Sequence, residues 1–132
     1  MFAPLRRLQK LFIGSNNFET ISSEILESLS GVTELNIDNN RLTFLPEVNI
    51  SFPNLQRVAI EGNPWQCPCY EELTKWLANN NVEYIRMHSS FYSGHKPLCV
   101  ATSSNYCIRD LKTVQKYEIE DHFDTAIETY QE

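Results

Sequence analysis

Glycine is scarce in this sequence, with 4 residues among 132, and no apolar run approaches the roughly 20 residues needed to cross a bilayer. So few glycines exclude the glycine-rich loops that hold phosphate groups in nucleotide-binding proteins. The lack of a long apolar run excludes a membrane-spanning helix, so we expect no membrane contact by this segment. No secretory signal is visible in the opening residues MFAPLRRLQK, which are poor in apolar residues and rich in basic ones, and we expect this chain to be a fragment.

Basic side chains are absent after Lys116. Up to that residue the acidic and basic side chains balance at 11 each, and the remainder of the sequence holds six acids with no Lys or Arg. The six acids are Glu118, Glu120, Asp121, Asp124, Glu128 and Glu132. The net charge of −6 therefore comes from the tail. Without a basic face to meet phosphate groups, we expect no nucleic-acid binding.

Three segments of the first half repeat one pattern of apolar residues. LQKLFIGSNNF, VTELNIDNNRL and LQRVAIEGNPW each fit L-x-x-L-x-L-x-x-N-x-L. The spacing predicts coils whose short strands pair in parallel and turn alternate residues inward, so that neighbouring coils share one core. Each segment carries one asparagine where the chain turns: Asn16, Asn40 and Asn63. We expect these side chains to bind backbone groups that the turn leaves unpaired.

This pattern resembles the leucine-rich repeat family over about residues 2–65. The resemblance implies an α/β fold, a solenoid of parallel short strands, with repeats over residues 1–62 in about two and a half coils. No N-terminal cap precedes these coils, so we expect the natural protein to continue upstream as a longer chain. Members of this family usually bind protein partners with the concave surface of the solenoid.

The sequence contains four cysteines: Cys67, Cys69, Cys99 and Cys107. An even number favours two disulfides, for which three connectivities exist. A redox pair would need C-x-x-C, whereas the first two cysteines here are spaced C-x-C. A zinc site could use Cys67, Cys69 and Cys99 with His88 or His95, but the halves lie far apart in the sequence. We favour structural disulfides and expect no metal.

The stretch NPWQCPCYEELTKWL resembles the cysteine-rich C-terminal cap of extracellular leucine-rich repeat proteins. The resemblance implies a disulfide-bonded cap over residues 63–110, the pairs Cys67–Cys99 and Cys69–Cys107, and a secreted or extracellular parent protein. The residues themselves predict a helix with Leu73, Trp76 and Leu77 on one face. The same helix is expected to carry Glu71 and Glu72 in its first turn, and residues 82–85 are expected to form a short strand inside the cap.

The cap sequence GHKPLCVATSSNYCIRDL is most similar to insect secreted members of the family, some of which serve innate immunity. On that resemblance the expected function is protein recognition in immunity, with cell adhesion or development as the alternative. The sequence contains no catalytic constellation, since its paired serines lie outside any G-x-S-x-G context. We therefore expect a protein that is not an enzyme and needs no cofactor.

The predicted strands place their outward residues in rows on the concave face. The residues predicted to contact a protein partner are Lys10, Phe12, Glu34, Asn36, Asp38, Arg57 and Glu61. Phe12 and Asp38 are expected to contribute most clearly, because a mixture of aromatic and polar side chains suits an interface. The alternative is a surface charge ladder of little energetic weight. Asn49 begins the sequon NIS and is a glycosylation acceptor on the return side of the coil if the protein is secreted.

Residues 111–132 form an acidic tail that the sequence predicts to be either helical or disordered. Its apolar residues Ile119, Phe123, Ile127 and Tyr130 lie at helical spacing. One interpretation is a frayed helix or a linker, and the other is a helix that docks on a partner helix or forms a dimer. A structural function for the whole segment, which would cap the repeats and dimerise while partner contacts lie upstream, stays open.

Overall fold

The computed structural model describes residues 9–22, 24–25, 31–46, 53–92 and 95–131. In chain order its elements are β1 (Lys10–Phe12), β2 (Glu34–Asn36), β3 (Arg57–Ala59), α3 (Cys67–Asn79), β4 (Glu83–Tyr84), α4 (Ser89–Tyr92) and α5 (Thr113–Gln131). None of the helices in these described ranges is both long and apolar enough to span a membrane.

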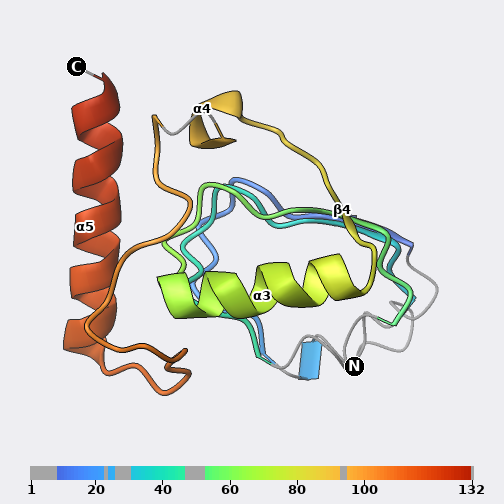
Figure 1. The fold of residues 1–132 in the computed structure, drawn as a ribbon, viewed down its shortest axis with the longest axis horizontal. Coiled ribbons are helices and arrows are strands. Elements are labelled where there is room, and N and C mark those ends of the chain that lie inside the picture. Colours follow the sequence, from blue (N-terminus) through green and yellow to red (C-terminus); the bar gives the residue numbers. More distant parts are fainter. Residues whose placement is uncertain (1–8, 23, 26–30, 47–52, 93–94, 132) are drawn as a thin grey trace.

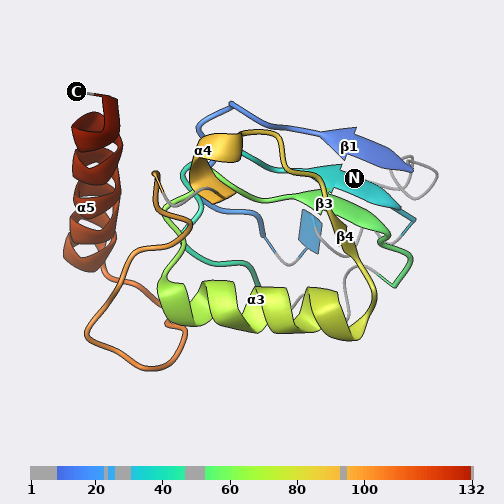
Figure 2. The same ribbon diagram turned by 45° about the horizontal axis from the view of Figure 1, so that its top comes forward.

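The strands form one parallel sheet in the order β1-β2-β3-β4 (Figure 2). Lys10 pairs with Glu34 and Glu34 pairs with Arg57, so equivalent positions of successive coils lie side by side. The predicted α/β solenoid of short parallel strands, closed by a disulfide-bonded cap with a helix, is confirmed.

The core lies inside the coils and extends to the buried side of α3. Its fully buried side chains include Leu35 and Ile37 of the second coil and Ile60 of the third, as the apolar pattern predicted. Phe18, which occupies the pattern position of Leu42, is instead 44% exposed, because β1 is the edge strand of the sheet. The buried residues of this main cluster are Ile21, Val32, Leu35, Ile37, Leu42, Leu45, Leu55, Val58, Ile60, Trp65, Leu73, Leu77 and Val82.

The asparagines of the turns form a hydrogen-bonded ladder between coils. The Oδ1 atom of Asn40 accepts hydrogen bonds from the backbone N–H groups of Asn16 and Phe18, both at 3.0 Å. One coil later, Oδ1 of Asn63 accepts from the N–H groups of Asn40 and Leu42 at 3.1 and 3.2 Å. Each asparagine thus satisfies backbone donors of the preceding coil, which would otherwise be left unpaired at the turn.

The cap helix α3 covers the end of the repeats, with Leu73 and Leu77 buried in the main cluster. Its start differs from the prediction. The helix begins at Cys67, so Glu71 and Glu72 lie beyond its first turn, and that turn contains no acidic residue. The reason is that Pro68 fits the first helical turn, where a missing N–H removes no hydrogen bond.

The short strand predicted in the cap is confirmed. Strand β4 is Glu83–Tyr84, and it pairs with β3 through Arg57 and Val58. It therefore extends the sheet of the repeats into the cap. This pairing covers the open edge of β3, which protects a strand that would otherwise expose unpaired backbone groups.

Helix α5 lies against the repeats and the cap, on the side toward which the strands run (Figure 1). Ile119 and Phe123 are buried there with Phe91 and Val100 in a second apolar cluster, which we call the α5 cluster. Partly buried Ile127 packs against the same cluster. The apolar stripe that the sequence places on the tail is therefore packed within this chain.

Candidate functional site

The cap is held by two disulfides that begin at α3. Cys67 is bonded to Cys99 with an S–S distance of 2.07 Å, and Cys69 is bonded to Cys107 at 2.08 Å. The resemblance to extracellular caps named these same two pairs. All four cysteines are used, so no thiol is free for redox chemistry or metal binding. The described residues also contain no cluster of His, Cys, Asp and Glu that could hold a metal ion.

The concave face is divided into an open part and a covered part. Phe12 is 58% exposed, Lys10 is exposed beside it, and Arg57 is exposed with its Nη1 atom 3.4 Å from Oε1 of Glu34. Three other predicted contact residues are buried: Asn36 is 9% exposed, Asp38 is 5% exposed and Glu61 is fully buried. The structure therefore brings the predicted residues onto one face but leaves only some of them open to solvent.

The covered part lies under residues 85–92, a segment that we call the strap. It leaves β4, crosses the carboxyl ends of the strands and reaches α4 (Figure 2). The Oε2 atom of Glu61 accepts hydrogen bonds from the backbone N–H groups of Met87 and His88, at 2.8 and 3.3 Å. Such bonds from backbone amides to a carboxylate are stronger than bonds between neutral groups. Glu61 is thus the main polar anchor of the strap.

His88 adds side-chain contacts to this anchor. Its Nε2 atom lies 2.7 Å from Nδ2 of Asn39 and 3.5 Å from Oδ2 of Asp38. The sequence offered no partner for His88, because both contacts come from a coil about 50 residues earlier in the chain. The imidazole therefore connects the strap to the second coil of the concave face.

Three buried polar atoms of the described residues have no hydrogen-bond partner: Oδ1 of Asn36, Oε1 of Glu61 and the hydroxyl of Tyr92. Burial raises the pKa of Tyr92, and the nearby charge of Glu61 raises it further. A buried polar atom without a partner costs about 1–3 kcal/mol. The contact between the strap and the concave face is therefore less favourable than a fully hydrogen-bonded interface of the same size.

Ion pairs connect α5 to the repeats. Arg41 makes a two-point contact with the carboxylate of Asp124, at 2.8 and 3.0 Å, and its Nε atom lies 3.0 Å from Oε1 of Glu120. The hydrogen bond to Asp124 raises the pKa of Arg41, so its charge is retained. Lys116 of the same helix contacts Glu19 of the first coil. Arg41 is the only basic residue in the sequence between the first and third strands, and it pairs with two of the six acids of the tail, Glu120 and Asp124.

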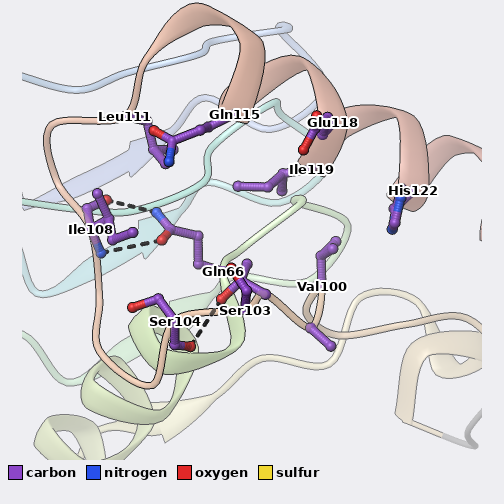
Figure 3. Close-up of a pocket in the computed structure, with 12 residues that line it drawn as sticks. Gln66, Val100, Ser103, Ser104, Ile108, Leu111, Gln115, Glu118, Ile119 and His122 are labelled. Atoms are coloured by element: carbon purple, nitrogen blue, oxygen red, sulfur yellow. Dashed lines mark hydrogen bonds between the residues drawn. The ribbon is translucent and has the colours of Figure 1, made fainter.

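A cavity of about 260 Å³ lies between α5 and residues 100–108, which we call the cap loop (Figure 3). At its floor the side chain of Gln66, which is fully buried, donates to the carbonyl of Ile108 at 2.8 Å and accepts from the N–H of Ile108 at 3.2 Å. Both polar ends of Gln66 are therefore satisfied, and the residue ties the start of α3 to the loop that follows Cys107. Ile119 and His122 line the helix side of the cavity (Figure 3).

Sequence similarity agrees with this geometry. A family model described as "Leucine rich repeat" matches residues 6–64. The chain carries leucine-rich repeats closed by a cysteine-rich cap. Stacked repeats of this kind create extended concave surfaces that proteins of this architecture use for binding.

Curated relatives match parts of this leucine-rich repeat chain. Chondroadherin of Mus musculus is 33% identical over 73 residues, which cover 54% of this chain and 20% of that protein. Immunoglobulin superfamily member 10 of Rattus norvegicus is 33% identical over 75 residues, covering 54% of this chain and 3% of that protein. Receptor-like protein 31 of Arabidopsis thaliana is 27% identical over 106 residues, covering 80% of this chain and 12% of that protein. The chain thus spans a fifth or less of the relatives it matches.

The residues predicted from the sequence differ in two ways from those that the structure describes. Asn49, the predicted glycosylation acceptor, lies outside the described residues. Sequence reasoning missed Gln66, His88 and Arg41, which hold the cap loop, the strap and α5. The local signal for a role of Gln66 was its position next to Trp65 in the closing coil. The sequence near His88 and Arg41 does not indicate their distant partners.

Proposed function

We propose that this module binds a protein ligand with the open part of its concave face. The observation that carries the proposal is the exposure of Phe12 next to the row of charged side chains formed by Lys10, Glu34 and Arg57. An exposed aromatic ring supplies a large apolar contact, and the neighbouring charges orient a partner and set its specificity. Asn36, Asp38 and Glu61 belong to the same face, where Asp38 and Glu61 contact the strap.

The test measures one partner against matched variants of the disulfide-bonded chain. A partner is selected from a library of extracellular proteins, and its affinity is measured by surface plasmon resonance. We expect Phe12→Ala to weaken binding at least tenfold, since a central aromatic contact contributes roughly 2 kcal/mol or more. Phe18→Ala is the matched control, because Phe18 is also an exposed phenylalanine of the first coil but lies beyond the strand. Equal affinities for the two variants would place the binding surface elsewhere.

The two disulfides support a proposed location outside the cell. Such bonds persist in oxidising compartments and are rare in the cytosol. We propose innate immune recognition as the process, on the resemblance of the cap sequence to insect secreted proteins. The alternative is the ectodomain of an adhesion or developmental receptor, which the similarity to receptor-like protein 31 favours. We also propose that the chain has no catalytic activity.

A second candidate function is dimerisation through α5. Two apolar residues of this helix point away from the α5 cluster, since Val114 is 69% exposed and Tyr117 is 74% exposed. Size-exclusion chromatography with light scattering tests this candidate. A dimer that dissociates in Tyr117→Ser would support it, and a monomeric parent chain at the concentration of the binding assay would remove it.

A further inference from the structure

Helix α5 contacts the strap, and the strap contacts the concave face. The C-terminal helix is therefore connected to the concave face through the strap. Phe91 belongs to α4, the last part of the strap, and its side chain is buried in the α5 cluster against Ile119 and Phe123. The strap is therefore held at two points. Glu61 binds its backbone at Met87 and His88, and α5 holds its end at Phe91.

We propose that α5 is a latch that keeps the strap closed over the concave face, and that undocking of α5 uncovers Asn36, Asp38 and Glu61. The part of this inference that concerns ligand access rests on the proposed binding function of the concave face. The part that concerns the coupling of α5 to the strap depends only on contacts within this chain. Both views place α4 between the carboxyl ends of the strands and α5 (Figures 1 and 2).

The composition of the covered surface favours a strap that opens. Closure buries the carboxylate oxygen Oε1 of Glu61, the amide oxygen of Asn36 and the hydroxyl of Tyr92 without partners among the described residues. Because such atoms are costly to bury, the polar contacts alone hold the strap weakly. The apolar contact of Phe91 with α5 then decides whether the closed arrangement persists.

The contacts that dock α5 are themselves suited to a latch. Among the described residues, the α5 cluster has four buried members: Phe91, Val100, Ile119 and Phe123. The ion pairs of Arg41 with Asp124 and Glu120 are partly exposed and are therefore weakened by salt. A small apolar cluster with a screened ion pair is easier to release than the disulfide-bonded core of the cap.

The uncovered surface has a definite chemistry. It presents the carboxylates of Asp38 and Glu61 and the carboxamide of Asn36, which lie in neighbouring rows of the sheet. In the closed state, backbone N–H groups of Met87 and His88 occupy the Glu61 carboxylate. A protein segment carrying Lys or Arg side chains would replace these donors with charged ones, which form shorter and stronger hydrogen bonds. The strap therefore occupies the place of such a ligand.

The test measures how accessible the two carboxylates are in the whole disulfide-bonded chain. A carbodiimide activates accessible carboxylates as O-acylisoureas. The amine of glycine ethyl ester then displaces the urea to form an amide, and peptide mass spectrometry gives the labelling rate at each residue. Glu83, which is exposed on β4, serves as the internal reference. We expect Phe123→Ala to raise the labelling rates of Asp38 and Glu61 at least fivefold relative to Glu83. Glu128→Ala is the control at an exposed position of the same helix, and we expect no change.

A second variant protects the test against misfolding of the first. Arg41→Gln removes the ion pairs with Asp124 and Glu120 but keeps that of Lys116 with Glu19, and it leaves the α5 cluster intact. We expect a smaller rise of about twofold at the same carboxylates. Circular dichroism checks that each variant is folded. Unchanged labelling of Asp38 and Glu61 in folded Phe123→Ala overturns the latch, as does rapid labelling of Glu61 in the parent chain. If Phe123→Ala is unfolded, the Arg41→Gln result decides. This test uses no partner, so its failure is distinct from a failure of the Phe12 binding test.

Discussion

The asparagine ladder offers the sharpest test of how the coils are held together. Replacing Asn63 by alanine removes an acceptor from two buried backbone donors, the N–H groups of Asn40 and Leu42. It also removes a donor from the carbonyls of Ile37 and Ile60, at 2.9 and 3.0 Å. These carbonyls keep other partners, because Asn40 Nδ2 donates to the first and the indole of Trp65 to the second.

The magnitude follows from this count of lost partners. Only the two N–H groups are left unsatisfied, and each buried donor without a partner costs about 1–3 kcal/mol. We therefore expect Asn63→Ala to lower the free energy of unfolding by about 2–6 kcal/mol. Asn63 is fully buried, so water does not reach these donors unless the turn rearranges.

The same substitution in the two earlier coils supplies the controls. Asn40→Ala frees the N–H groups of Asn16 and Phe18, which are exposed residues that water can reach, so we expect a loss of about 1–3 kcal/mol. The side chain of Asn16 is exposed and, among the described residues, donates to the carbonyl of Gly14, so Asn16→Ala should cost less than about 1 kcal/mol.

Urea unfolding of the disulfide-bonded chain, followed by tryptophan fluorescence and circular dichroism, measures all three variants. The expected order of destabilisation is Asn63, then Asn40, then Asn16. Equal losses at Asn63 and Asn16 would refute the reasoning, because they would show that the buried donors find other partners when the side chain is removed.

Three further outcomes are expected. Replacing Cys69 and Cys107 by serine opens a loop of 38 residues and should lower the free energy of unfolding by about 4 kcal/mol, measured by urea titration; a loss below about 1 kcal/mol would contradict it. The hydrogen bond from Lys116 lowers the pKa of Glu19 below its usual value of 4.5. This pair therefore stabilises the fold above pH 4.5, and the stabilisation is lost as the pH falls through the lowered pKa. An NMR titration should show the lowered pKa of Glu19 in the parent chain and its return to the usual value in Lys116→Ala. Gly62 has a φ of +80°, and an added Cβ would lie 2.1 Å from the Asn39 side chain, so Gly62→Ala should lower stability by at least about 1–2 kcal/mol in thermal unfolding, whereas an unchanged melting temperature would show that the turn adapts.

The concave face shows where sequence reasoning stopped. The repeat period placed Asn36 and Asp38 on the outward side of the strands, and the pairing register agrees with that placement. Outward residues are exposed only if nothing else packs on them, and His88 of the strap lies 3.5 Å from Asp38. The strap comes from a segment about 50 residues later in the chain, so no local pattern around these two residues could reveal it.

The tail illustrates a similar limit. Its helical spacing identified Ile119, Phe123 and Ile127 as one apolar stripe, and these residues do lie on one side of α5. An amphipathic helix buries such a stripe against whatever apolar surface is available. Whether that surface belongs to the same chain or to a partner depends on Phe91 and Val100, whose position is set by the disulfide-bonded cap.

The sequence by itself determined the repeating part of this protein. Its apolar period and turn asparagines recur every 23 or 24 residues, and coils of that period must pack on their neighbours because no coil can bury its own apolar face. The tertiary structure alone decided which residues of the concave face remain open. Glu61 is buried beneath Met87 and His88, while Phe12 on the edge strand is exposed, because the strap crosses the last coils and does not cover the first.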